Sequence, residues 1–153
     1  MRNTMIIMAL VLSMLSSLPA CTTNYIYPKN VLADPNHTEI VSIRKHPRET
    51  YVVIYNPNIC KQIGDACSFF LSHAYAHYRL DHSLIKPKFY PSLSENQADC
   101  YVAKYADPIV LHAAIEFLED ENRDPNIIIR GNALKRAENI RNCAIEAGNW
   151  TKS

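Results

Sequence analysis

Four of the five cysteines, those that follow Cys21, constrain the fold of this chain more than any other feature of its sequence. An even number of cysteines in an exported domain predicts two disulfides, and four cysteines can pair in three ways. We expect disulfides between Cys60 and Cys67 and between Cys100 and Cys143. Free buried thiols are the alternative. A zinc site made of four thiolates is disfavoured because the chain contains no C-x-x-C pair.

The Cys60–Cys67 pair requires the backbone to turn between the two cysteines. In a continuous helix, residues seven apart would have Cα atoms about 10 Å apart, which is too far for a disulfide. Gly64-Asp65 can supply the turn. The Cys100–Cys143 pair would tie the C-terminal helix to a helix in the middle of the chain.

The first 20 residues have the pattern of a secretory signal peptide. Arg2 supplies a positive charge, and an almost unbroken apolar run extends from Met5 to Leu15. This run is too short to span a bilayer easily. Leu18-Pro-Ala-Cys21 then resembles the bacterial lipobox, which predicts a lipid-modified Cys21 that anchors the protein to a membrane of the cell envelope. Cleavage nearby, giving a periplasmic or secreted protein, is the alternative.

The rest of the chain is long enough for one domain with one core. Residues 21–36 are polar and rich in Asn, Pro and Thr, which predicts a tether before a domain over residues 37–153. Residues 1–20 contain one arginine and no acid, so their removal lowers the formal net charge from +1 to 0. This balance predicts no nucleic-acid partner.

The local patterns predict an α+β fold that is mostly helical and has a small antiparallel sheet. The stretch Tyr51–Tyr55 is β-branched and aromatic, and it can form a hairpin with Glu39–Ile43. Helical periodicity and capping residues predict four main helices. These run from about Asp65 to Arg79 or Asp81, from Ser92 or Ser94 to Tyr105, from Pro108 to Glu119, and from Asn132 to Ala147.

Two histidines on the first of these helices have the spacing of metal ligands. His73 and His77 are four residues apart, so their side chains leave one helix face about one turn apart. A zinc site of the catalytic type needs a third protein ligand. The candidates are Glu95, which begins a separate helix, and His82, which lies on the opposite face unless the chain turns after Asp81.

The segments Phe69-Phe-Leu-Ser-His-Ala-Tyr-Ala-His77 and Glu95-Asn-Gln-Ala-Asp99 together resemble the gluzincin metallopeptidases. These enzymes have an H-E-x-x-H helix and a later E-x-x-x-D helix. The chain is also similar to small exported bacterial proteins that have a related cysteine frame and end in an Arg-x-x-x-Ile-Arg-x-Cys-Ala segment, here Arg136 to Ala144.

This resemblance implies a zincin-like domain that holds Zn²⁺ between its first two main helices. The implied zinc ligands are His73, His77 and Glu95, and Asp99 is implied to support a ligating imidazole. The resemblance also implies that the strand Tyr51–Tyr55 lines a cleft and pairs with an extended peptide. Another envelope protein is an alternative partner.

The chain departs from the family pattern at Ala74. The family has a Glu at this position, which acts as the general base that activates the zinc-bound water. With Ala74, no catalytic residue of the motif is intact, and we expect a zinc-binding pseudopeptidase. The alternatives are an active zinc metallopeptidase with an unrecognised base, and a metal-free structural or interaction protein of the envelope.

Overall fold

The structure is a computed structural model and describes residues 26–48, 50–82 and 91–150. The predicted signal peptide (residues 1–20) and the predicted lipidation site Cys21 lie outside the described residues. The predicted tether, residues 21–36, is wrong in one part, because it contains a strand, β1 (Val31–Ala33). This strand pairs with Val53–Tyr55 and so covers an edge of the sheet that would otherwise expose unpaired backbone groups.

The sheet has three strands in the order β1-β3-β2. Its antiparallel pair, β2 (Val41–Arg44) with β3 (Val52–Tyr55), confirms the predicted hairpin. Because β1 runs parallel to β3, the sheet is mixed, whereas we predicted an antiparallel one. The predicted α+β class is confirmed. Among the described strands, β3 is the central one, and its Val53 side chain is fully buried.

Five helices follow the sheet in the described part of the chain, and the four that the sequence predicts are all present. The additional helix, α1, begins where the side chain of Asn56 accepts hydrogen bonds from the amides of Asn58 and Ile59 at 2.8 and 3.2 Å. The helices are α1 (Pro57–Ile63), α2 (Ala66–Arg79), α3 (Pro91–Ala103), α4 (Pro108–Glu119) and α5 (Ala133–Glu146).

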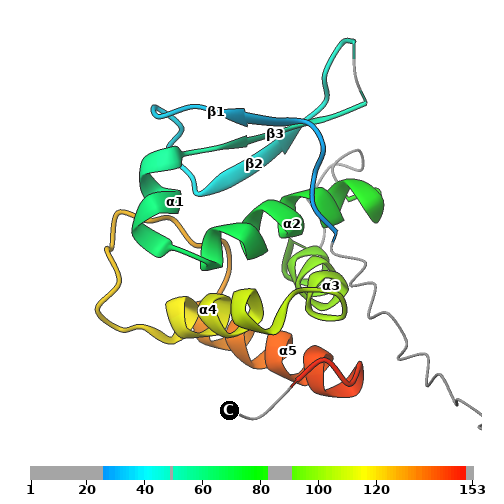
Figure 1. The fold of residues 1–153 in the computed structure, drawn as a ribbon, viewed down its shortest axis with the longest axis vertical. Helices are drawn as coiled ribbons and strands as arrows, with labels where there is room; N and C mark the ends of the chain where they lie inside the picture. The colour runs from blue at the N-terminus through cyan, green and yellow to red at the C-terminus, as the bar shows by residue number, and fades with distance from the viewer. Residues whose placement is uncertain (1–25, 49, 83–90, 151–153) are drawn as a thin grey trace, which may run out of the picture.

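Helix α2 forms the middle layer of the molecule, with the sheet on one side and α3, α4 and α5 on the other (Figure 1). Its buried Phe69 and Phe70 belong to the main core, which also contains Leu111 and Leu118 of α4 and Ile140 of α5. Many helix-facing core positions are alanines, and these let the helices approach closely. They are Ala66, Ala76, Ala98, Ala103, Ala114, Ala133, Ala137 and Ala144.

Both predicted disulfides are present. The Cα atoms are 5.0 Å apart in Cys60–Cys67 and 5.2 Å apart in Cys100–Cys143. The predicted turn lies between α1 and α2, where Gly64 has a φ of 58°. Two disulfides indicate an oxidising compartment outside the cytoplasm. In the described part of the chain, none of the helices combines the length and the apolar character needed to cross a membrane.

The two disulfides should differ in their contribution to stability. They close loops with sequence separations of 7 and 43 residues, and the longer loop removes more entropy from the unfolded chain. We expect Cys100→Ala with Cys143→Ala to lower the free energy of unfolding by about 4 kcal/mol, and Cys60→Ala with Cys67→Ala by about 2.5 kcal/mol. Urea unfolding of both double variants measures this difference, and the reverse order would contradict it.

Candidate metal centre

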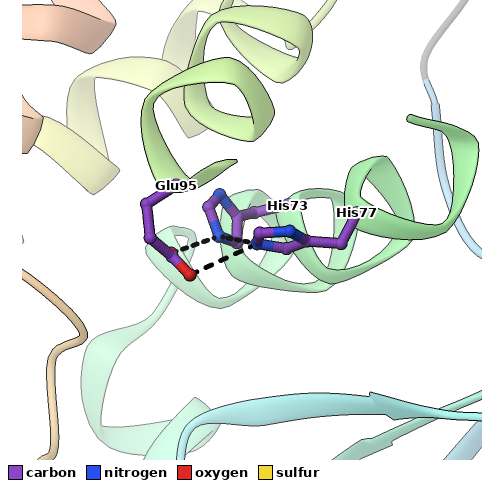
Figure 2. Close-up of side chains that lie close together, drawn as sticks. All are labelled: His73, His77 and Glu95. Atoms are coloured by element: carbon purple, nitrogen blue, oxygen red, sulfur yellow. Dashed lines mark hydrogen bonds and ion pairs between the residues drawn. The ribbon is translucent and has the colours of Figure 1, made fainter. Parts of the chain in front are cut away.

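Three side chains from α2 and α3 converge on one point (Figure 2). The Nε2 atom of His73 lies 3.0 Å from Glu95 Oε2 and 3.0 Å from the Nε2 atom of His77. The Nε2 atom of His77 lies 3.5 Å from Glu95 Oε1. The two histidines meet because they are one turn apart on α2, and Glu95 reaches them because the first turns of α3 pack against that helix.

These distances fit a metal ion. Ligand atoms at the corners of a tetrahedron with bonds of about 2.1 Å are separated by about 3.4 Å. One nitrogen of each histidine and one oxygen of Glu95 all lie within 4.8 Å of one another. The group His73, His77 and Glu95 can therefore hold a metal ion through two imidazoles and a carboxylate.

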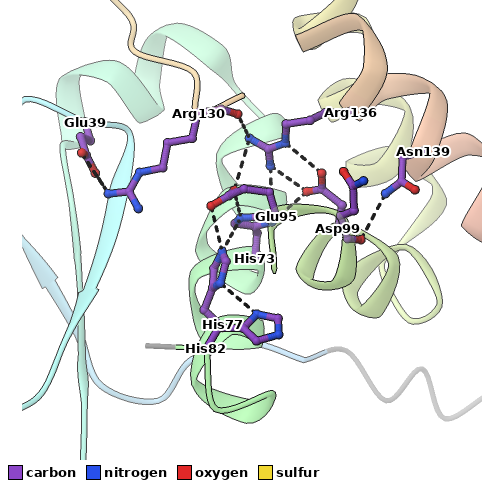
Figure 3. A network of polar contacts seen from close by, with 10 residues as sticks. Glu39, His73, His77, His82, Glu95, Asp99, Arg130, Arg136 and Asn139 are labelled. Carbon is purple, nitrogen blue, oxygen red and sulfur yellow. Dashed lines mark hydrogen bonds and ion pairs between the residues drawn. The ribbon is translucent and has the colours of Figure 1, made fainter. Parts of the chain in front are cut away.

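Asp99 and Arg136 lie near the Nδ1 side of the His73 ring, away from His77 (Figure 3). The Nδ1 atom of His73 is 2.8 Å from Asp99 Oδ1, so the ring presents its other nitrogen, Nε2, to the cluster. Arg136 of α5 donates two hydrogen bonds to the Asp99 carboxylate, from Nη2 at 2.7 Å and from Nε at 2.8 Å. All three side chains are buried. Asp99 therefore occupies the supporting position that the sequence predicts for it.

The charges of the cluster depend on its neighbours. Burial is the largest influence on the pKa of His73 and lowers it, but the carboxylates of Asp99 and Glu95 together outweigh burial, and the pKa of His73 ends above its ordinary value. Burial is also the largest influence on the pKa of His77, and together with the neighbouring histidines it outweighs the opposing effect of Glu95 and lowers this pKa. Burial raises the pKa of Glu95, yet hydrogen bonds from both histidines hold it well below its usual range. Glu95 is therefore ionised and His77 neutral at neutral pH.

A cavity of about 730 Å³ opens in front of the cluster. The resemblance implied that Tyr51–Tyr55 lines the cleft, but this strand is β3, and both of its edges are already paired. The cavity is instead lined by Val41–Ile43 of β2, which pairs with β3 on one side only among the described strands. An edge strand beside a cavity has free backbone groups for an extended ligand.

Ala74 lies beside the cluster on the wall of this cavity and is buried, with 4% of its surface exposed. Its methyl group can neither accept nor donate a proton. Among the described residues that line the cavity, Glu95 is the only acidic one, and it already contacts both histidines. None of these described lining residues therefore offers a second carboxylate to act as a base.

Two residues of the network were not predicted from the sequence to contact the cluster where the structure places them. The first is Arg136. Its position three residues after Ala133 and four before Ile140 puts it on the buried face of α5, and this spacing is the signal that could have identified it. The second is His82, which lies near His77 because the chain turns after Asp81. His112 of α4 lies outside this network: it stacks on Trp150 at a ring distance of 4.3 Å and does not line the cavity.

Comparisons with protein-family models, with curated proteins and with solved structures find no match to this chain. The likeness to gluzincins therefore stays a prediction based on the two motifs, while the convergence of their side chains is a feature of the structure.

The Arg136–Asp99 pair should stabilise the fold strongly. Arg136→Met leaves the buried Asp99 carboxylate without its partner, and breaking a buried pair in this way costs about 3–5 kcal/mol. Arg130→Met removes the same group from an exposed pair with Glu39 and should cost at most about 1 kcal/mol. Denaturant unfolding of both variants measures the two losses. Equal losses would show that the buried pair does not hold the helices together.

Proposed function

We propose that this chain is a zinc-binding, metallopeptidase-like protein of the cell envelope that has lost the hydrolytic step. The observation that carries the proposal is the convergence of His73, His77 and Glu95, with ligand atoms 3.0–3.5 Å apart. Imidazole and carboxylate ligands suit zinc, and three protein ligands leave a position open for an exogenous molecule.

Each residue of the cluster has a separate role in this proposal. His73 and His77 would each supply an Nε2 lone pair, and Glu95 would supply a carboxylate oxygen. Asp99 keeps the Nδ1 proton of His73 in place, and Arg136 holds the Asp99 carboxylate in position by two hydrogen bonds. Bound zinc would supply Lewis-acid polarisation of a ligand carbonyl. Ala74 provides no group that accepts a proton, so binding would occur without efficient hydrolysis.

The proposed ligand is an extended peptide or a segment of another envelope protein. The free edge of β2 would pair with its backbone, and the cavity would receive the part that reaches the cluster. A lipid on Cys21 would hold this site close to a membrane. The two disulfides agree with such an exported location.

The protein should bind one zinc ion per chain. Glu95→Gln removes a charged ligand. It should weaken zinc binding by more than 10–100-fold, the loss that is typical when a residue hydrogen-bonded to a metal ligand is removed. Glu116→Gln changes an exposed glutamate of α4 in the same way and should leave zinc affinity unchanged. Competition with a chromophoric chelator measures both affinities. Equal affinities for the two variants would remove the cluster from consideration as the zinc site.

Zinc binding should weaken as the pH falls. The raised pKa of His73 means that the metal-free site holds a proton at this ring below that pKa, and zinc must displace it. The affinity should therefore fall about tenfold for each pH unit below the pKa of His73 and level off above it. Calorimetry in buffers with different ionisation enthalpies should detect about one proton released per zinc on the acidic side.

Restoring the carboxylate should restore hydrolysis. General acid–base assistance contributes roughly 10²–10⁴-fold to a rate, so zinc-loaded Ala74→Glu should cleave an unstructured peptide faster than the natural chain by a factor in this range. Ala74→Gln has a similar size without the charge and should remain inactive. Comparable cleavage by the natural chain and Ala74→Glu would favour the alternative of an active metallopeptidase with another base.

One observation favours a second function, that of a metal-free interaction protein. With His73 protonated, the cations His73 and Arg136 balance the anions Glu95 and Asp99, and all four side chains have partners. The cluster can therefore be stable as a buried polar network in the absence of metal. Zinc analysis of untagged protein separates the two functions, since the metal-free alternative predicts no stoichiometric zinc.

A further inference from the structure

The C-terminal end of α2 has an unusual turn. The amide of Asp81 donates to the carbonyl of Tyr78 at 3.1 Å, and the amide of His82 donates to the carbonyl of His77 at 2.8 Å. Asp81 has a φ of 61° and is the only non-glycine residue with a positive φ among the described residues. This pair of hydrogen bonds around a left-handed residue is the Schellman motif, in which glycine usually takes the left-handed position.

The motif places His82 directly against His77. The hydrogen bond from the His82 amide to the His77 carbonyl closes the turn, so the two side chains come together although they are five positions apart. The Nδ1 atoms of the two rings are 3.2 Å apart, as Figure 3 shows by a dashed line. The sequence-based argument that His82 lies on the wrong helix face fails because the helix ends at Arg79.

The contact lies on the side of the His77 ring that faces away from the metal cluster. His77 directs Nε2 toward His73 and Glu95, at 3.0 and 3.5 Å, and directs Nδ1 toward His82. Among the described residues, the group that can hold a metal ion consists of His73, His77 and Glu95 and does not include His82. His82 is therefore placed to bind the ring of a ligand rather than to be one.

We propose that His82 is a positioning residue for the metal centre, which accepts the Nδ1 proton of His77 and thereby directs the Nε2 lone pair at the metal. This inference rests on the proposed function, since it assigns a role in zinc binding. A ligating histidine almost always donates its other N–H to a fixed partner, which sets the tautomer and the orientation of the ring. His73 has Asp99 as this partner, and His82 would be the equivalent partner of His77.

The two histidines would then have partners of different charge. Asp99 is an anion fixed by Arg136, whereas His82 would accept the proton through a ring nitrogen. His82 is also partly exposed and lines the cavity, while Asp99 is fully buried. His82 is therefore more accessible than Asp99, and it can be substituted without opening the core.

Zinc affinity of four proteins tests the proposal. His82→Ala removes the acceptor and should weaken zinc binding about 10–100-fold. His82→Asn places a side-chain oxygen where Nδ1 now lies and should keep the affinity within about threefold of the natural chain. Asp81→Gly retains the left-handed turn, because glycine adopts a positive φ readily, and should also leave the affinity unchanged.

A second measurement reports the hydrogen bond itself. In the zinc-loaded natural chain and in His82→Asn, the Nδ1 proton of His77 should be visible by ¹⁵N-resolved NMR and protected from exchange with water. In His82→Ala this proton should exchange faster and its signal should broaden or disappear. A residue that acted only on the stability of the helix end would not produce this difference between the alanine and asparagine variants.

The outcomes separate this inference from the proposed function. If the natural chain binds zinc and His82→Ala binds it equally well with an equally protected proton, the positioning role is wrong and the zinc site stands. If His82→Asn loses as much affinity as His82→Ala, acceptance of the proton is not the reason for the loss and the inference fails. If the natural chain binds no zinc, the proposed function and this inference both fail.

Discussion

The buried ion pair between Asp99 and Arg136 joins α3 to α5, and the geometry of the candidate metal centre on α2 and α3 depends on it. Arg136 belongs to α5, Asp99 to α3, and Asp99 in turn contacts His73 of α2 at 2.8 Å. A buried carboxylate without this partner would be costly, so the pair fixes how α3 and α5 lie against α2. The position of His73, and through it the whole cluster, follows from that arrangement.

Covalent bonds hold the same elements in place. Cys100 follows Asp99 on α3, and its disulfide with Cys143 joins α3 to α5, the two helices that the ion pair also connects. The Cys60–Cys67 disulfide fixes the start of α2 against α1. In a domain of this size the disulfides add to the modest stability that one core supplies. The site is therefore built on rigid helices rather than on loops.

The sequence predicted most of the features that depend on local pattern. The four main helices, the β2–β3 hairpin and both disulfides are confirmed. Helical periodicity and capping residues are local signals, and four cysteines can pair in only three ways. Helix α1 was missed since Asn56 and Pro57 look like the end of a strand, yet they also cap the helix that follows. The short strand β1 was missed because three residues carry little pattern of their own.

The features that the sequence did not predict depend on tertiary contacts. Arg136 is a core residue of α5 whose partner lies 37 positions earlier, and no local signal names that partner. His82 reaches His77 only through a left-handed turn at Asp81, a residue type that does not demand such a turn. The prediction that Tyr51–Tyr55 lines the cleft was wrong. The third strand, β1, pairs with the far edge of β3, and β2 is the strand that lies beside the cavity.

We propose that the chain has a zinc site made of His73, His77 and Glu95 and lacks a general base at Ala74. X-ray absorption at the zinc edge of the purified, untagged protein identifies the atoms that bind the metal. We expect a shell of nitrogen and oxygen neighbours at about 2.0–2.2 Å, including two imidazoles, and no sulfur. A sulfur shell at about 2.3 Å, or protein that holds no zinc after exposure to it, would rule out this site.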